Sequence, residues 1–412
     1  MMNSYIFFLG NNPALSAIEL VTTLKREGLL PRIKAGREKF LWLDLPESLP
    51  DDFLSCLGGV DRIAKLRAKQ ESAWTAEELA QVLSPAPSKF NLGISTLNIG
   101  DGYDVRRIGF EVKKLFKQEA VKVKFILPQK RGGRLNAAQI IFNKLTSPPN
   151  KELTIIKCGD EYLLAETVQI QDIQAYEKRD TSRPVRDARV GMLPPKLAQI
   201  MLNLVPSFPG RPPTILDPFC GLGTILQEGY LMGYRVIGSD ISERMVEASR
   251  KNLASLESAA GPVISLHNVR EAFPGELAGK IDAVVTEPDL GEPLTSPLPR
   301  TALEKRMRES EGLYLDFFKN IRSVLKDEAW IVFALPAFAN KSVDKVAYDC
   351  LPDGFLDEVR KLGYSLSQLL PDELKQNYRV SERGTIIYAR PDALLGRELT
   401  LWHTRKPEGQ HN

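Results

Sequence analysis

The spacing of apolar residues changes along the chain, and the change near residue 190 predicts a doubly wound sheet in the second half. From there on, short apolar runs alternate with helix-like stretches. That alternation is typical of an α/β fold with a largely parallel sheet. The strands it predicts are residues 214–216, 235–238, 263–266, 282–286 and 329–334, with a late pair at 383–390 and 397–402.

The first half has a different pattern, which predicts two smaller α+β modules. Expected strands are 5–9, 40–45, 90–97, 121–127, 152–157 and 161–168, and expected helices are 13–26, 74–83, 104–118 and 136–145. A Pro- and Ser-rich loop at 84–88 and a polar stretch after 176 suggest boundaries. The predicted domains are therefore 1–85, 86–176, a linker at 177–205, and 206–412.

The turn after the strand at 214–216 carries the first chemical signal. It reads Asp217-Pro-Phe-Cys-Gly-Leu-Gly223 and leads into a predicted helix and a second strand that ends at Asp240. Strand, glycine turn, helix, strand and acid form a nucleotide-binding βαβ pattern, in which the acid accepts from a ribose diol. The glycines allow close backbone approach because they lack a Cβ atom. The alternative is an ordinary tight turn, which explains neither the acid nor its spacing.

The acid that precedes the glycines indicates which nucleotide binds. A carboxylate at Asp217 would repel the pyrophosphate of a dinucleotide, which prefers a glycine turn that opens directly onto a helix N-terminus. It would suit the ammonium and sulfonium of S-adenosylmethionine. We therefore expect S-adenosylmethionine as the cofactor.

The amino-acid composition excludes few classes of protein. The chain has 412 residues, 43% apolar and 26% charged, with a net charge of +3, which is ordinary for a globular protein. Its four cysteines and three histidines are scattered, so neither a disulfide framework nor a metal site is expected. No signal peptide or membrane span is predicted.

Positive charge is concentrated between residues 104 and 134, a segment with ten Lys or Arg and three Asp or Glu residues. Phe110, Phe116 and Phe125 are interleaved with these cations, as in surfaces that follow a phosphate backbone. A solvated helix face followed by a strand is an equally good interpretation of this segment alone. The candidate RNA-binding residues are Lys113, Lys114, Lys117, Lys122, Lys124, Lys130, Arg131 and Arg134.

Several strings together resemble a known family. They are Leu57-Gly-Gly-Val-Asp61, Leu135-Asn136, Arg179-Asp180, Arg183-Pro184, Gly191-Met-Leu-Pro-Pro-Lys-Leu-Ala198 and Asp217-Pro-Phe-Cys-Gly-Leu-Gly223. The chain resembles class I, Rossmann-like methyltransferases that carry an N-terminal THUMP domain and modify tRNA guanosine at N2. The resemblance implies a ferredoxin-like module, a THUMP-like RNA-binding domain, a linker and a catalytic domain, with tRNA as the partner in the cytoplasm.

The resemblance also assigns cofactor contacts residue by residue. It implies that the methionine end contacts the first loop and that Asp240 and Ile241 hold the ribose side. Asn268, after the third strand, is expected at the adenine edge, although an Asn that caps its own loop is an equal alternative. The loop residues concerned are Asp217, Phe219, Gly221, Gly223 and Thr224.

Amino-group methyltransferases carry a motif after the fourth strand, usually Asp/Asn-Pro-Pro-Tyr/Phe, and this chain departs from it. Here the strand at 282–286 leads to Glu287, Pro288, Asp289 and Leu290, the candidate catalytic residues; Glu287 also borders the cofactor site. In the motif, the side-chain oxygen and the first proline carbonyl accept both amine hydrogens, which turns the nitrogen lone pair towards the methyl group. The Glu is longer, and the stacking aromatic is lost.

These departures leave three hypotheses open. The first is tRNA guanosine-N2 methylation. The second is methylation of an amine on another RNA or DNA base, and the third is an RNA-binding protein with a vestigial cofactor fold. Residues 378–402 resemble the last antiparallel strands of this fold and are expected to be structural.

Overall fold

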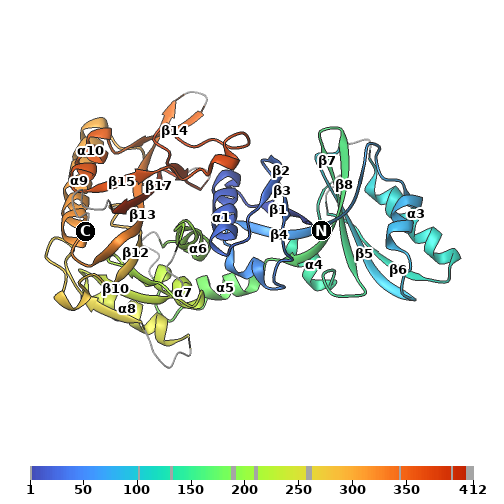
Figure 1. Ribbon diagram of the computed structural model, residues 1–412, viewed down its shortest axis with the longest axis horizontal. Helices are drawn as coiled ribbons and strands as arrows, with labels where there is room; N and C mark the ends of the chain where they lie inside the picture. The colour runs from blue at the N-terminus through green and yellow to red at the C-terminus, as the bar shows by residue number, and fades with distance from the viewer. Residues whose placement is uncertain are drawn as a thin grey trace, which may run out of the picture. The chain divides into compact units, whose positions relative to one another are not determined.

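The structure is a computed structural model that describes residues 2–100, 103–129, 133–186, 192–207, 212–256, 262–342, 345–390 and 393–404 (Figure 1). Its internal contacts divide the chain into two compact units. The first unit comprises Met1–Ala17 and Glu27–Ala175, and the second comprises Ile18–Arg26 and Tyr176–Asn412. Each unit is built on its own sheet.

The first unit has one eight-stranded sheet to which both predicted N-terminal modules contribute strands. Strand β5 pairs in parallel with β6 and β7, and the other pairs are antiparallel. In spatial order the strands are β2 (Arg32–Arg37), β3 (Phe40–Leu45), β1 (Asn3–Leu9), β4 (Val60–Gln70), β8 (Glu161–Ile170), β7 (Lys151–Cys158), β5 (Lys89–Leu97) and β6 (Lys122–Ile126). The helices of this unit are α2 (Ala76–Leu83), α3 (Val105–Gln118) and α4 (Ala137–Phe142), and α1 (Pro13–Arg26) is divided between the two units after Ala17.

Strand β4 was not predicted, because charged residues interrupt the apolar pattern in its second half. Two of these side chains pair with acids on the neighbouring strand β8. The Nε atom of Arg67 lies 2.8 Å from Oε2 of Glu166, and Nζ of Lys69 lies 2.6 Å from Oε1 of Glu161. Cross-strand pairs of opposite charge stabilise a sheet on its solvated face, which an apolar alternation does not reveal.

The second unit contains the expected doubly wound sheet, and the α/β fold class is confirmed. The first five strands are parallel, and the antiparallel β17 lies between β13 and β15. In spatial order they are β11 (Val263–Leu266), β10 (Arg235–Asp240), β9 (Thr214–Asp217), β12 (Ile281–Thr286), β13 (Leu325–Ser342), β17 (Leu395–Thr404) and β15 (Tyr364–Ser367). Strand β14 (Lys345–Cys350) pairs with β13, and β16 (Ile386–Tyr388) pairs with β17.

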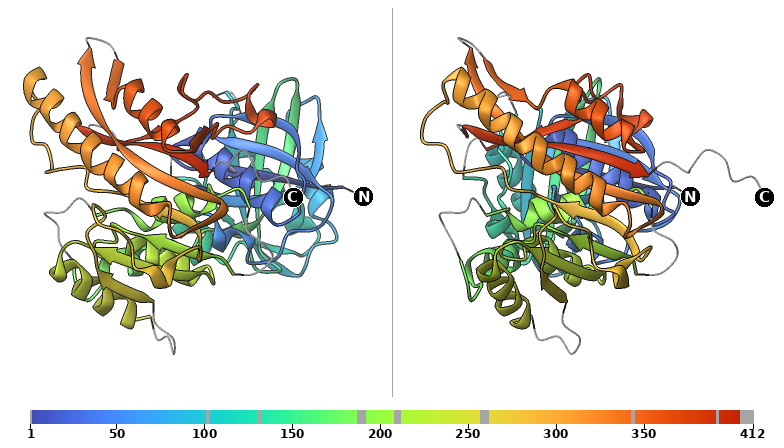
Figure 2. Two further views of the ribbon diagram at one scale, coloured as in Figure 1. Left: turned by 60° about the vertical axis from the view of Figure 1, so that its left-hand side comes forward. Right: turned by 90° about the vertical axis from the view of Figure 1, so that its left-hand side faces the viewer.

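Six helices among the described residues accompany this sheet. They are α5 (Ile173–Thr181), α6 (Pro195–Asn203), α7 (Thr224–Leu231), α8 (Glu243–Ala254), α9 (Arg300–Ile321) and α10 (Asp353–Lys361). Figure 2 shows the long helix α9, drawn in orange, lying along strand β13. Helices on both faces bury the central strands, and every residue of β12 is buried.

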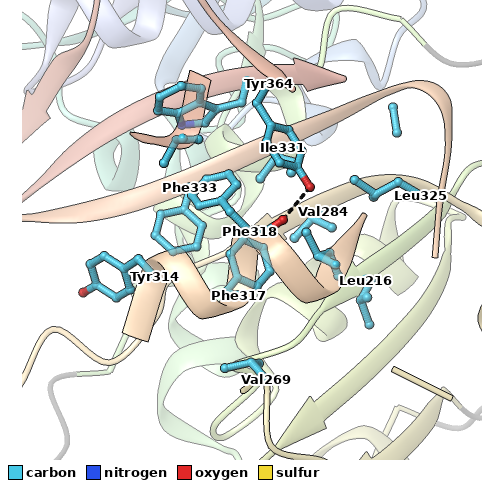
Figure 3. Close-up of a cluster of buried hydrophobic side chains, with 14 of the residues drawn as sticks. Leu216, Val269, Val284, Tyr314, Phe317, Phe318, Leu325, Ile331, Phe333 and Tyr364 are labelled. Atoms are coloured by element: carbon cyan, nitrogen blue, oxygen red, sulfur yellow. Dashed lines mark hydrogen bonds between the residues drawn. The ribbon is translucent and has the colours of Figure 1, made fainter. Parts of the chain in front are cut away.

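The core of the second unit fixes the strands that end at the site. Helix α9 presents Tyr314, Phe317 and Phe318 to the sheet, and their spacing places all three on one helix face. The ring of Phe317 stacks on that of Phe333 of β13, with centroids 5.1 Å apart. Figure 3 shows Phe317, Phe318 and Phe333 grouped together. The hydroxyl of Tyr364 donates to the carbonyl of Phe318 at 2.8 Å. This aromatic layer holds α9 against the strands whose carboxyl ends face the cavity described next.

None of the helices in the described residues is both long and apolar enough to cross a bilayer. No group of three or more His, Cys, Asp or Glu side chains in the same residues is arranged to hold a metal ion.

Candidate active site

A cavity of about 680 Å³ lies at the carboxyl ends of β9, β10 and β12. Open α/β sheets bind ligands at this edge. The cavity is lined by all but one of the residues predicted to bind the cofactor or to act in catalysis. The exception is Gly223, whose missing Cβ would lie 2.4 Å from Oγ of Ser249. Gly223 therefore serves the packing of α7 against α8 rather than the cavity wall.

The loop after β9 is held by hydrogen bonds within and beside it. The Oδ1 atom of Asp217 accepts from the Thr286 hydroxyl at 2.6 Å and from the backbone N–H of Phe219 at 3.3 Å. Gly221 and Gly223 have φ angles of +50° and +83°, in the left-handed region that favours glycine. These residues turn the chain from β9 into α7 with the Asp217 side chain buried beneath the loop.

Asp240, at the end of β10, is tied to the same loop. Its Oδ2 accepts from the backbone N–H of Gly221 at 2.9 Å, and its Oδ1 accepts from that of Ser242 at 2.9 Å. Each carboxylate oxygen keeps a further lone pair. The acid therefore has a fixed orientation and can still accept from a ligand hydroxyl.

Burial raises the pKa values of the two acids beside the glycine loop, Asp217 and Asp240. Burial raises the pKa of Asp217 to about 7, against the lowering effect of the hydrogen bonds from Thr286 and Phe219; the charges of Asp240 and Glu287 raise it further. Burial also raises the pKa of Asp240, which its backbone hydrogen bonds oppose. A cationic ligand would lower both pKa values and so bind together with proton release.

Thr224 is the first residue of helix α7. Its hydroxyl accepts a hydrogen bond from Arg183, which lies in the predicted linker. The Nη1 atom of Arg183 donates to Oγ1 of Thr224 at 2.6 Å, and Nε of Arg183 donates to the carbonyl of Arg179 at 2.7 Å. The Arg183-Pro184 string was part of the family resemblance, but its contact with the glycine loop was not foreseen.

Three further cofactor candidates differ in what their side chains offer. Ile241 is 70% exposed and lines the cavity beside Asp240, which suits an apolar ring face. Phe219 packs towards the core, with its ring centroid 5.9 Å from that of Phe317. Asn268 lines the cavity but also caps its own loop, because its Oδ1 accepts from the backbone N–H of Arg270 at 3.1 Å.

The loop after β12 brings the candidate catalytic residues to the same cavity. Asp289, which stands where the motif has a second proline, is exposed, and its Oδ1 accepts from the backbone N–H of Gly291 at 2.8 Å. The Tyr314 hydroxyl donates to the carbonyl of Asp289 at 2.8 Å. The Asp289 side chain thus forms a turn with the backbone two residues further on. This turn orders the loop at a position where the motif has a rigid proline.

A second contact from α9 holds the far end of that loop. The Nη2 atom of Arg306 donates to the carbonyls of Leu290 at 2.8 Å and Glu292 at 2.6 Å. Gly291 has a φ of +82°, and a Cβ there would lie 2.4 Å from the Arg306 guanidinium. Leu290 is buried and lines the cavity, so it offers the ligand an apolar contact.

Glu287 forms an ion pair with Arg397, which lies in the segment 378–402 that was expected to be structural. The Nε atom of Arg397, on β17, donates to Oε1 of Glu287 at 2.6 Å. Burial raises the pKa of Glu287, and the charge and hydrogen bond of Arg397 oppose that rise. Arg397 also lines the cavity. No local motif reveals it, because it lies 110 residues after Glu287 in the chain.

The chain is similar to known methyltransferases. Residues 183–348 match the family model UPF0020, an RMKL-like methyltransferase domain. A tRNA (guanine(10)-N2)-dimethyltransferase of Methanothermobacter thermautotrophicus is 40% identical over 148 residues, 36% of this chain and 40% of that protein. A probable tRNA (guanine(10)-N2)-dimethyltransferase of Methanothermococcus thermolithotrophicus is 33% identical over 144 residues, 34% of this chain and 78% of that protein.

The chain belongs to this family of methyltransferases. It spans less than half the length of the Methanothermobacter relative. The solved structure of TrmN from Thermus thermophilus, with 15% identity and a TM-score of 0.51, covers 98% of this chain and 100% of its own, and it shows the shared fold. The expected methyltransferase half is confirmed, while the THUMP identity of the N-terminal unit stays a prediction.

The cofactor of the family is S-adenosylmethionine, as predicted, and the cavity has the chemistry to hold it. Asp217 and Asp240 supply negative charge for a cationic amino-acid end and acceptors for a diol. Ile241 supplies an apolar surface at the rim. A dinucleotide would place its pyrophosphate beside Asp217, where charge repulsion disfavours it.

The predicted RNA-binding residues lie in the first unit of this methyltransferase. Lys113, Lys114 and Lys117 are exposed on α3, and Lys122 and Lys124 are exposed on β6, which packs beside it. Arg134 is half-buried over the ring of Phe8 at 5.4 Å, and burial lowers its pKa. Lys130 and Arg131 lie outside the described residues. The structure therefore brings five of the eight to one helix and the adjoining strand.

Proposed function

We propose that this protein transfers a methyl group from S-adenosylmethionine to the exocyclic N2 amine of a guanosine in tRNA. The observation that carries the proposal is that Glu287 and Pro288 line the same cavity as Asp217 and Asp240. An acceptor for an amine thus borders the acids suited to the methyl donor. The relatives' activity on tRNA guanine supports the choice of substrate.

The cofactor contacts follow from the chemistry of the lining side chains. Asp217 receives the ammonium at the methionine end, and Asp240 accepts from the ribose hydroxyls. Ile241 packs on the adenine ring, with Asn268 at the adenine edge. When bound, S-adenosylmethionine supplies an electrophilic methyl group on a sulfonium.

Glu287 and Pro288 prepare the target nitrogen. A carboxylate oxygen of Glu287 and the backbone carbonyl of Pro288 accept the two amine hydrogens, which frees the nitrogen lone pair from the base ring. The new N–C bond forms as the S–C bond breaks, and one amine proton passes to Glu287 or to water. Leu290 packs against the base in place of the usual aromatic.

The first unit supplies RNA binding in this proposal. We assign residues 1–85 to a ferredoxin-like module, 86–176 to a THUMP-like domain, 177–205 to the linker and 206–412 to the catalytic domain. The exposed lysines of α3 and β6 contact phosphates of the tRNA acceptor end. Action on tRNA places the enzyme in the cytoplasm.

The test is methyl transfer from labelled S-adenosylmethionine to an unmodified tRNA transcript by the purified full chain, with mass spectrometry of the methylated nucleotide. We expect N2-methylguanosine. Methyl groups on adenine or cytosine would support the hypothesis of another base. Cofactor binding without transfer to RNA would support a vestigial site. Either result would overturn the proposal.

A variant pair tests the role of Glu287. Glu287→Ala should lower kcat about 100-fold or more, because the amine loses its charged acceptor, while the cofactor Kd stays within about twofold. Glu309→Ala, which removes an exposed acid of α9, should leave both unchanged. Full activity in Glu287→Ala would refute the assignment.

A further inference from the structure

Two arginines, Arg270 and Arg397, line a cavity wall that carries four acids, and Arg270 pairs with Asp316 of α9 at 3.4 Å. Asp217, Asp240, Glu287 and Asp289 all line this space. The side chains of Arg397 and Glu287 are only 16% and 12% exposed. Ion pairs this secluded are costly unless geometry is good, and this one stands where the substrate base is expected.

The backbone holds Arg397 in place from two sides. Strand β17 pairs with β13 on one side and with β16 on the other, where Arg397 is opposite Pro336 and Tyr388. The Arg397 guanidinium donates to Glu287 through Nε alone. Its two terminal nitrogens have no hydrogen-bond partner among the described residues. A rigid strand thus presents unpaired donors beside the catalytic carboxylate.

Among the described residues, Arg397 is the cation that forms an ion pair with Glu287. Several titratable groups near Glu287 are not cations. They are the acids Asp217 on β9 and Asp289 on the loop after β12, and the phenol of Tyr314 on α9. Arg306, also on α9, donates through Nη2 to the carbonyls of Leu290 and Glu292 and leaves its Nε without a hydrogen-bond partner among the described residues, but it is not one of the residues that line the cavity. Arg397 is therefore the described cation placed to keep Glu287 ionised and to donate into the cavity next to it.

We propose that Arg397 determines the choice of guanine, by donating to O6 of the base while Glu287 accepts from its N2 amine. This inference rests on the proposed function. Along one edge, guanine offers donors at N2 and N1 and an acceptor at O6. Glu287 supplies an acceptor for the N2 amine, and Arg397, next to it, supplies a donor for O6. The two side chains therefore match the order of groups on guanine. Adenine offers an amine donor where guanine has O6, so it would place a donor against the arginine.

The discriminating substrate is a tRNA with 2-aminopurine at the methylated position. This base keeps the 2-amine, lacks O6 and carries no hydrogen on N1. Comparing wild type with Arg397→Met on both bases therefore isolates the contribution of the arginine. Wild type should methylate guanosine about 30-fold faster in kcat/KM than 2-aminopurine, since a good pair of contacts to a base contributes about 1–3 kcal/mol of discrimination. In Arg397→Met that ratio should fall to about threefold or less, with the cofactor Kd unchanged.

Control variants separate this role from a structural one. Arg397→Lys keeps the charge but loses the planar fork, so it should retain an intermediate ratio. Arg300→Met removes an arginine that is 89% exposed and should leave the wild-type ratio. Equal rates of wild type on the two bases would overturn the inference without any variant, and so would a full ratio in Arg397→Met. Failure of wild type on guanosine would instead overturn the proposed function.

Discussion

The loops after β9 and β12 follow neighbouring strands and line one cavity, yet they are stabilised in different ways. The loop after β9 is held mainly within its own βαβ unit, where Asp217 accepts from Phe219 and Asp240 accepts from Gly221. The Thr286 hydroxyl and Arg183 add contacts from outside that unit. The loop after β12 is held by side chains of α9 and β17, through Tyr314, Arg306 and Arg397. Cofactor binding and catalysis should therefore respond to different substitutions.

The largest expected effect concerns the first loop alone. Asp217→Asn removes the negative charge expected to meet the cofactor ammonium and should weaken S-adenosylmethionine binding about 100-fold at pH 7.5, because hydrogen bonds between charged groups are the strong ones. Calorimetry measures the Kd. At saturating cofactor, kcat should change less than Kd. A larger fall in kcat than in affinity would contradict the separation of the two loops.

A smaller effect is expected from the glycine of the second loop. Gly291→Ala forces a non-glycine residue to a φ of +82° and moves Arg306 away from the Leu290 and Glu292 carbonyls. We expect kcat to fall about 30-fold, from about 1–2 kcal/mol of backbone strain and the lost contacts. The cofactor Kd should stay within about twofold.

A matched control isolates the contact from the strain. Gly279→Ala places alanine at a φ of +62° where a Cβ meets no atom within 4 Å. It should lower stability in thermal melts and leave kcat unchanged. Equal loss of kcat in both glycine variants would show that the Arg306 contact does not matter.

This contrast also explains what the sequence could predict. The first loop is local: its acid, its glycines and Asp240 lie within one βαβ unit, so a linear pattern reveals them. The second loop depends on Arg306 and Arg397, which lie 16 and 110 residues from their partners. Nothing in a linear pattern links an arginine on a late strand to a carboxylate on an earlier loop.

The same reasoning applies to the fold. Strand β12 was predicted because its centre, residues 283–285, is an apolar run, as is typical of a strand buried on both faces. Strand β4 was not, because the exposed half of its pattern carries charges that pair with β8. The pattern of apolar residues predicts strands that are buried. It does not predict a strand that is stabilised by polar contacts across the sheet.

Acid should weaken cofactor binding through the first loop. The pKa of Asp217 is raised to about 7, so its carboxylate is mostly ionised at pH 7.5 and mostly protonated at pH 6. A neutral acid cannot pair with an ammonium. The Kd of S-adenosylmethionine should therefore rise about tenfold between these pH values. Asp217→Asn should bind weakly at both, with a nearly flat profile, and a steep profile in that variant would assign the titration to another group.

The smallest effect compares two buried hydroxyls of one aromatic core. Tyr314→Phe removes a bond to the Asp289 carbonyl in the second loop, and Tyr364→Phe removes a bond of the same 2.8 Å length to the Phe318 carbonyl in α9. Each should destabilise the fold by about 1 kcal/mol and lower Tm similarly. Because only the first bond reaches the catalytic loop, kcat should fall about fivefold in Tyr314→Phe and stay unchanged in Tyr364→Phe. If both variants lose activity together, the loop depends on core stability as a whole, and the directed support from α9 inferred here is wrong.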